Sequence, residues 1–171
     1  PAESLSLAHN RLSGTLPGGP IGTTYVDLDA NAFTGHLPDA YSDGLRVLKI
    51  SYSGDEPGSG EPGAGAGLSG TLPAGLAKAS ALQWLELDGN RLSGSLPADV
   101  FSSLAQLSVL QMSGNDLRGP IPAAHLPTCG APNCACDLSA NCYDPKTVPA
   151  ACMGEGGKPE KPCASGGGPK K

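Results

Sequence analysis

The stretch Asn90-Arg-Leu92-Ser-Gly94-Ser-Leu96-Pro97 is one of five versions of a single phrase, in which Asn and Leu or Phe precede Gly-x-(Leu/Ile)-Pro. The other versions end at Pro17, Pro38, Pro73 and Pro122, and the version at Pro73 keeps only its second half. The glycines of the phrase are residues 14, 35, 70, 94 and 119, so they are 21, 35, 24 and 25 residues apart. Repeats of this length are typical of a solenoid built from stacked coils.

A short alternating pattern precedes the Asn place of each unit, which Ser53 occupies in the third unit. Apolar residues alternate with other residues there, as in Leu85-x-Leu87 and Leu110-x-Met112. Alternation of this kind is typical of a strand with one buried face. Because one unit is too small to bury that face alone, we expect the units to stack. We also expect the Asn side chain of each unit to bond backbone groups of adjacent coils.

Composition limits the class of partner. The net charge is −5 and the only run of basic residues is the final Lys170-Lys171 pair, which argues against nucleic acid. No apolar run approaches the ~18 residues that a membrane-spanning helix needs, so this segment is not expected to insert into a membrane. Many of the 25 glycines and 17 prolines occupy fixed places in the repeat, and they are interpreted as turn residues.

All the cysteines lie in the last third of the chain. An even number in a short, Pro-rich segment favours disulfides and an oxidising, extracellular compartment. Bound zinc is the alternative, but the sequence contains no Cys-x-x-Cys pair. We therefore predict that disulfides form among Cys129, Cys134, Cys136, Cys142, Cys152 and Cys163.

The full pattern, L-x-x-L-x-L-x-x-N-x-L-(S/T)-G-x-(L/I)-P, resembles the plant-type leucine-rich repeat over about residues 2–122. The resemblance implies an α/β repeat solenoid of about five coils, with a parallel concave β-sheet, a second short strand in each coil and little helix. Only residues 74–80 and 98–107 suggest a helical turn. Ectodomains of this family bind proteins, peptides or glycans, and their repeats are not catalytic.

Three parts of the chain differ in composition. Residues 1–122 are predicted to form the solenoid, 123–163 a cysteine-rich cap that contains a degenerate closing coil at 137–142, and 164–171 a flexible tail. Residues 53–67 are predicted to be a flexible insertion, because Gly, Pro and acidic residues bury little apolar area. The first strand has no polar cap before it, so upstream repeats of a longer protein, or a neighbouring chain, are expected to cover that end.

Residues between the inward-facing leucines should point outward from the concave sheet. They make an acidic surface with a few aromatic side chains, and aromatics beside fixed polar groups suit a protein epitope or a sugar ring. Ordinary filling of repeat positions is the alternative interpretation. The predicted ligand-binding residues are Tyr25, Asp27, Asp29, Lys49, Tyr52, Trp84, Glu86, Asp88 and Gln111.

Three functions are compatible with this pattern. The leading hypothesis is an extracellular, cell-surface or cell-wall recognition module that binds a protein, peptide or glycan. The second is a structural component of an extracellular assembly that contacts neighbouring protomers through its N-terminal coil. The third is a polysaccharide-cleaving enzyme, because Asp27 and Glu86 should be ~9.5 Å apart, yet an open sheet lacks the buried pocket that an acid catalyst needs. We therefore predict no enzymatic activity, no cofactor and no metal.

Overall fold

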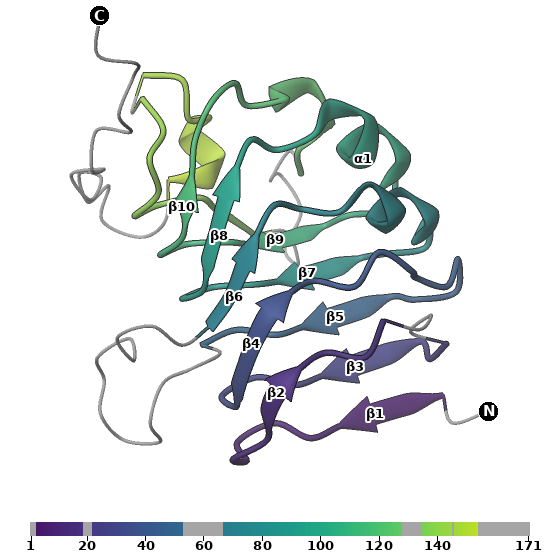
Figure 1. Cartoon of the computed structure of the whole chain (residues 1–171). Helices are drawn as coiled ribbons and strands as arrows, with labels where there is room; N and C mark the ends of the chain where they lie inside the picture. The colour runs from purple at the N-terminus through teal and green to yellow at the C-terminus, as the bar shows by residue number, and fades with distance from the viewer. Residues whose placement is uncertain (1–2, 19–21, 53–66, 128–134, 145, 154–171) are drawn as a thin grey trace, which may run out of the picture.

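The computed structural model describes residues 3–18, 22–52, 67–127, 135–144 and 146–153. These residues form a leucine-rich-repeat solenoid of about five turns, as predicted, in which each coil adds one strand to a main sheet (Figure 1). All strand pairs in this sheet are parallel. The order of its strands is β1 (Ser4–Ser6), β3 (Tyr25–Asp27), β5 (Val47–Lys49), β7 (Trp84–Glu86), β9 (Val109–Gln111) and β11 (Ala135–Asp137).

A second parallel sheet follows the main sheet along the coils. Its strands in spatial order are β10 (Asp116–Leu117), β8 (Arg91–Gly94), β6 (Gly67–Gly70), β4 (Ala32–His36) and β2 (Ser13–Thr15). The resemblance to the plant-type repeat implied this second strand. Gly67, which the sequence places in the flexible insertion, is the first residue of β6; the rest of that insertion lies outside the described residues.

Helix is scarce in the described part of the chain. The two predicted helical turns are confirmed as the 3₁₀-helix η1 (Ala74–Lys78) and the α-helix α1 (Ala98–Ser103). Two more 3₁₀-helices, η2 (Ala123–His125) and η3 (Ala150–Cys152), lie near the C-terminal end. None of the helices described here is long and apolar enough to cross a lipid bilayer.

The core is a stack of the repeat leucines. Leu48, Leu85 and Leu110, at the centre of successive main-sheet strands, have no exposed surface, whereas the residues on either side of them in sequence keep some exposure, except Val109, which is buried. Leu68 and Leu92 fill the other side of the core from the second sheet. Each coil therefore buries its apolar face against the coils before and after it, which is the source of stability in a solenoid.

A ladder of asparagine side chains joins the coils, as predicted. In Asn90, the amide nitrogen donates to the carbonyls of Leu87 in its own coil and Ile50 in the preceding coil, at 3.1 and 2.8 Å. Its carbonyl oxygen accepts the backbone N–H of Leu68 at 3.1 Å. The same arrangement recurs at Asn31, Asn115 and Asn141, all of which are at most 1% exposed. The Asn place of the third coil, Ser53, lies outside the described residues.

The glycine of the repeat phrase is needed for its backbone conformation, because its φ is positive in all five copies of the phrase. Gly70 has a φ of +82°, a conformation that L side chains rarely adopt. A Cβ at Gly70 would also lie 2.3 Å from the His36 ring of the preceding coil. Beside it, the Ser69 hydroxyl donates to the carbonyl of Gly35 at 3.1 Å, so hydroxyl groups link the coils of the second sheet.

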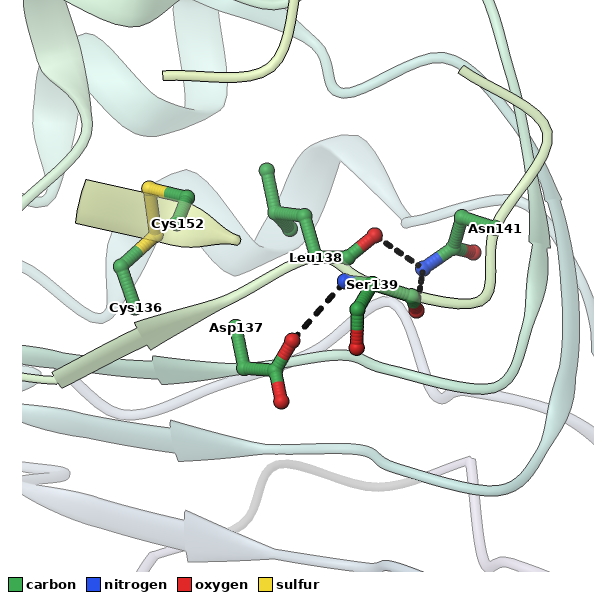
Figure 2. The surroundings of a disulfide bond; sticks show 6 residues. All are labelled: Cys136, Asp137, Leu138, Ser139, Asn141 and Cys152. Atoms are coloured by element: carbon green, nitrogen blue, oxygen red, sulfur yellow. Dashed lines mark hydrogen bonds between the residues drawn. A yellow bond between two sulfur atoms is a disulfide. The ribbon is translucent and has the colours of Figure 1, made fainter. Parts of the chain in front are cut away.

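Part of the predicted cysteine-rich cap continues the solenoid. Strand β11 pairs with β9, and Asn141 extends the asparagine ladder, so residues 137–142 form the closing coil that the sequence indicates. Cys136 on β11 is bonded to Cys152 on η3, as Figure 2 shows, and Leu138 N–H donates to the carbonyl of Cys152 at 2.9 Å. Cys142 is also disulfide-bonded. Cys129, Cys134 and Cys163 and the tail from residue 164 lie outside the described residues, and the division at residue 122 stays a prediction.

Candidate binding face

The main sheet presents two rows of side chains on its outer side, which we call the main-sheet face. The rows follow from the register of the strands, because directly paired residues stand side by side. The first row includes Tyr25, Val47, Trp84 and the buried Val109. The second row consists of Asp27, Lys49, Glu86, Gln111 and Asp137.

Trp84 is held in place by its two neighbours on the main-sheet face. Its indole N–H donates to Glu86 Oε2 at 2.9 Å, and the Lys49 ammonium is 4.7 Å from the centre of its ring. Lys49 Nζ also lies 3.1 Å from the same Glu86 oxygen. Burial lowers the pKa of Lys49, but the hydrogen bond and charge of Glu86, together with the charges of Asp29 and Asp27, outweigh burial, so the pKa of Lys49 is raised. Trp84 remains 36% exposed, so its ring is both oriented and accessible.

Tyr25 and Asp27 form a second fixed pair on β3. The Tyr25 hydroxyl donates to Asp27 Oδ2 at 3.1 Å. Burial and this neighbouring carboxylate together raise the pKa of Tyr25. Asp27 and Glu86 are the two carboxylates that suggested an enzyme. The register puts Lys49 between them, and Lys49 is paired with Glu86.

Asp29 and Asp88, which the sequence places on the same face, lie just after the strands and bond across coils. Asp29 Oδ1 accepts the N–H of Ser51 at 2.6 Å. Asp88 Oδ1 accepts the N–H and the hydroxyl of Ser113 at 2.6 and 2.7 Å, and Asp88 is only 4% exposed. Between them, Ser51 Oγ accepts the N–H of Asp88 at 3.0 Å. These residues form an Asp–Ser ladder beneath the main-sheet face, which the sequence did not indicate.

Burial has a large effect on both carboxyl groups of this ladder. It raises the pKa of Asp29 to about 6, against the lowering effect of the Ser51 N–H, and Glu86 and Asp27 add to the rise. It likewise raises the pKa of Asp88 to about 6, against the two bonds from Ser113 and with further rises from Glu86 and Asp137. A carboxylate in such a place is disfavoured because it is desolvated and has acids as neighbours.

Two predicted residues, Gln111 and Tyr52, remain to be placed. Gln111 is on β9 in the second row, beside Glu86. Tyr52 lies in the turn after β5 with a φ of 52°, is 51% exposed, and has its ring where a side chain on Gly89 would be. Asp137 completes the second row although the sequence analysis did not select it. Its position between Cys136 and Leu138, in the degenerate closing coil, is equivalent to that of Glu86 between Leu85 and Leu87 and could have identified it.

The charge of this region is one-sided. Together, the main-sheet face and the Asp–Ser ladder carry the acids Asp27, Asp29, Glu86, Asp88 and Asp137, but Lys49 is the one basic residue. Arg46, just before β5, is the nearest basic residue in sequence to this group. A partner with positive charge would therefore meet an attractive potential on this side of the molecule.

Comparison with known proteins defines the class to which this fold belongs. The family model described as "Leucine Rich Repeat" matches residues 2–21 and 81–103. Receptor-like protein 18 of Arabidopsis thaliana is 32% identical over 122 residues, which are 70% of this chain and 13% of that protein. Receptor-like protein 35 of the same plant is 30% identical over 129 residues, which are 73% of this chain and 12% of that protein.

Solved structures show the same relationship. The ectodomain of BIR2 from Arabidopsis thaliana is 28% identical, with a TM-score of 0.63 over 86% of this chain and 72% of that chain. The PEPR1–AtPEP1 structure is 26% identical, with a TM-score of 0.61 over 82% of this chain and 18% of that chain. The chain is therefore a plant-type leucine-rich-repeat protein, related to receptor-like proteins and to receptor ectodomains. It spans only about one eighth of the length of the receptor-like proteins it matches.

Proposed function

We propose that this chain is an extracellular, non-catalytic recognition module that binds a protein or peptide segment on its main-sheet face. The observation that carries the proposal is the cluster of Trp84, Glu86 and Lys49. An exposed indole whose orientation is already fixed loses little freedom when it binds, and tryptophan is among the residues that dominate binding energy at interfaces.

The shape of the face favours an extended partner. The first row offers two aromatic rings with Val47 between them, and the second row offers carboxylates alongside. Because neighbouring strands are about 4.8 Å apart, Tyr25 and Trp84 are about 9.6 Å apart along the stack. Successive side chains of an extended segment point to opposite sides. A segment that crosses the strands could therefore direct one set of side chains to the first row and the other set to the second row.

The relatives support a polypeptide partner. HAESA, 29% identical with a TM-score of 0.51, is seen in complex with the peptide hormone IDA and the co-receptor SERK1. RGFR1, 25% identical, is a plant peptide hormone receptor seen in complex with RGF2. A glycan is the other ligand class, but Lys49 already occupies a position over the Trp84 ring, which leaves less of that ring for a sugar.

Two further properties belong to the same proposal. An extracellular location, at a cell surface or in a cell wall, is supported by the Cys136–Cys152 disulfide and by the relationship to plant receptor ectodomains. A lack of catalysis is supported by the site itself, because Lys49 stands between Asp27 and Glu86, where a sugar-cleaving enzyme would hold its substrate and water.

Replacing Trp84 should weaken binding more than any other change on this face. A display library of random twelve-residue peptides, selected against the 171-residue chain, supplies the probe. We expect the enriched peptides to bind Trp84→Ala at least about tenfold more weakly than the wild type, because the variant loses an ordered aromatic anchor. Trp84→Phe should lose less, because it keeps a ring beneath Lys49.

The matched control for this experiment is Thr71→Ala, an exposed change directly after β6 on the second sheet. It should leave affinity unchanged within about twofold. An equal loss in Thr71→Ala and Trp84→Ala, or enriched peptides that do not respond to Trp84→Ala, would contradict binding at this face.

A second candidate function is assembly through the N-terminal coil. Leu5, Leu7 and Leu12 are 39–40% exposed and surround an apolar hollow of about 500 Å³. The edge strands β1 and β2 end both sheets at this same end of the molecule, as Figure 1 shows. In Asn10, moreover, the side chain bonds only the carbonyls of its own coil, Leu7 and Ala8. We propose a second copy of the chain as the occupant of this surface.

The assembly candidate predicts a concentration-dependent mass. Light scattering should show dimers of the wild-type chain at about 100 μM and monomers of Leu7→Asp, because a carboxylate would have to be buried at the joint. Leu7 is already exposed in the single chain, so the change should cost the monomer little stability. A monomeric wild type at that concentration would reject this candidate without affecting the recognition proposal.

A further inference from the structure

In the Asp–Ser ladder, two kinds of side chain, aspartate and serine, make the same hydrogen bond to the next coil. Two positions after each of the six strands of the main sheet stand, in chain order, Ala8, Asp29, Ser51, Asp88, Ser113 and Ser139. Asp29, Ser51 and Asp88 each accept the backbone N–H of the next coil through a side-chain oxygen. Serine is therefore sufficient for the bond, and aspartate adds something that the bond does not require: a group that can gain a proton.

Among the described residues, the charged groups that act on the two aspartates are mostly acids, and the one base among them is already paired. The charged groups that act on Asp29 are Asp27 on β3 in the same coil, Glu86 on β7 and Lys49 on β5, and Lys49 is paired with Glu86 at 3.1 Å. Those that act on Asp88 are Glu86 and Asp137, both acids, and its other neighbour is the neutral Ser113. A buried carboxylate with acidic neighbours costs free energy that is removed when the group is protonated.

We propose that Asp29 and Asp88 form a proton-responsive pair of links between coils, which stabilises the solenoid and removes negative charge from beneath the main-sheet face as the solution is acidified from neutral pH to about pH 5. The Oδ1 atoms keep their bonds to Ser51 and Ser113 when the proton is on the other oxygen of each carboxyl group. Protonation therefore removes the unfavourable charge without breaking the links.

The direction of the effect is opposite to ordinary acid unfolding. The folded-state pKa of both groups is about 6, above the value of 3.8 for an unperturbed aspartate, so between these values the folded chain binds more protons than the unfolded chain. Stability from these groups must then increase as pH falls from about 7 towards 4, and it is lost as pH rises through 6. Asp29 is about half solvated, which reduces its share of the effect.

Urea unfolding at pH 7.5 and pH 5.0 tests the proposal. For the wild-type 171-residue chain we expect the midpoint at pH 5.0 to be higher by about 0.5–1 M. In the double variant Asp29→Ser/Asp88→Ser, which copies the residue found at position 51, the difference between the two pH values should disappear. In Asp99→Asn, which changes an exposed acid in α1, the difference should stay.

Two results would overturn the proposal. One is a wild-type midpoint that is unchanged or lower at pH 5.0, and the other is a double variant that keeps the wild-type difference. If the double variant does not fold, an NMR titration of carboxyl ¹³C signals in the wild type replaces it. Two carboxyl groups with midpoints near pH 6 would support the proposal, and midpoints near pH 4 for Asp29 and Asp88 would reject it. None of these outcomes depends on peptide binding, so the recognition proposal is tested separately.

Discussion

Asn115→Ala should lower the free energy of unfolding by about 3–5 kcal/mol, because several buried backbone groups lose their partners at once. The Asn115 amide nitrogen donates to the carbonyls of Leu87 and Met112 at 2.9 and 3.1 Å, and its oxygen accepts the N–H of Leu92 at 3.0 Å. Asn115 is 1% exposed, so water cannot replace these bonds at low cost. Urea unfolding followed by circular dichroism measures the loss.

Asn10→Ala is the matched control for this change. Asn10 is the equivalent residue of the first coil, but it is exposed and bonds only Leu7 and Ala8 of its own coil. We expect it to cost about 1 kcal/mol or less, because water can solvate the freed carbonyls. Equal costs for the two variants would show that the ladder bonds between coils do not stabilise the stack.

Gly75→Ala should destabilise the chain by about 3 kcal/mol or more, the second large effect that the structure predicts. A Cβ on Gly75 would lie 1.9 Å from the backbone oxygen of Asp39 and 2.6 Å from its Oδ1. Asp39 Oδ1 also accepts the N–H of Gly75 at 2.6 Å, so a shift of η1 away from Asp39 would break this bond between coils. Thermal and urea unfolding both report the change.

Gly44→Ala provides the comparison for Gly75→Ala. A Cβ there would meet only Ser42 Oγ, at the ordinary contact distance of 3.7 Å, and no left-handed φ forbids a side chain. Its cost should remain within about 0.5 kcal/mol. A mild effect at Gly75, similar to that at Gly44, would mean that η1 is free to move and does not pack rigidly on the preceding coil.

The repetition in the sequence was enough to predict the coils. The alternating leucines define the strands because each strand has only three residues. One apolar residue at its centre, such as Leu85 in β7, and a more exposed residue on either side are enough to identify it. The Asn ladder could be predicted because the same residue recurs where the chain turns. The alternating pattern of the second strand in each coil is too weak to identify that strand. Its prediction came from the family resemblance.

The candidate site was harder to predict because the strands are short. β7 ends at Glu86, and the chain turns through Gly89 with a φ of +61° before Asn90. Alternation stops where the strand stops, so Asp88 turns beneath the face although a continued strand would have placed it outside. The same turn explains Tyr52, whose φ of 52° carries its ring over Gly89.

Contacts within the face depend on side-chain geometry that no repeat pattern contains. The sequence places Lys49, Trp84 and Glu86 on adjacent strands once the coils are aligned. It does not show that one oxygen of Glu86 accepts from the indole at 2.9 Å and also lies 3.1 Å from the lysine nitrogen. That shared contact orders Trp84, and it depends on the choice of rotamer in three long side chains.

Backbone chemical-shift mapping with one enriched peptide is the most direct test of recognition at the main-sheet face. The proposal predicts that the amide signals that move on titration belong to β3, β5, β7 and β9, together with the Trp84 indole N–H. Trp84→Ala should abolish the shifts at the same peptide concentration, and Thr71→Ala should preserve them. Shifts confined to the second sheet, or to the exposed coil around Leu5 and Leu12, would contradict the proposal.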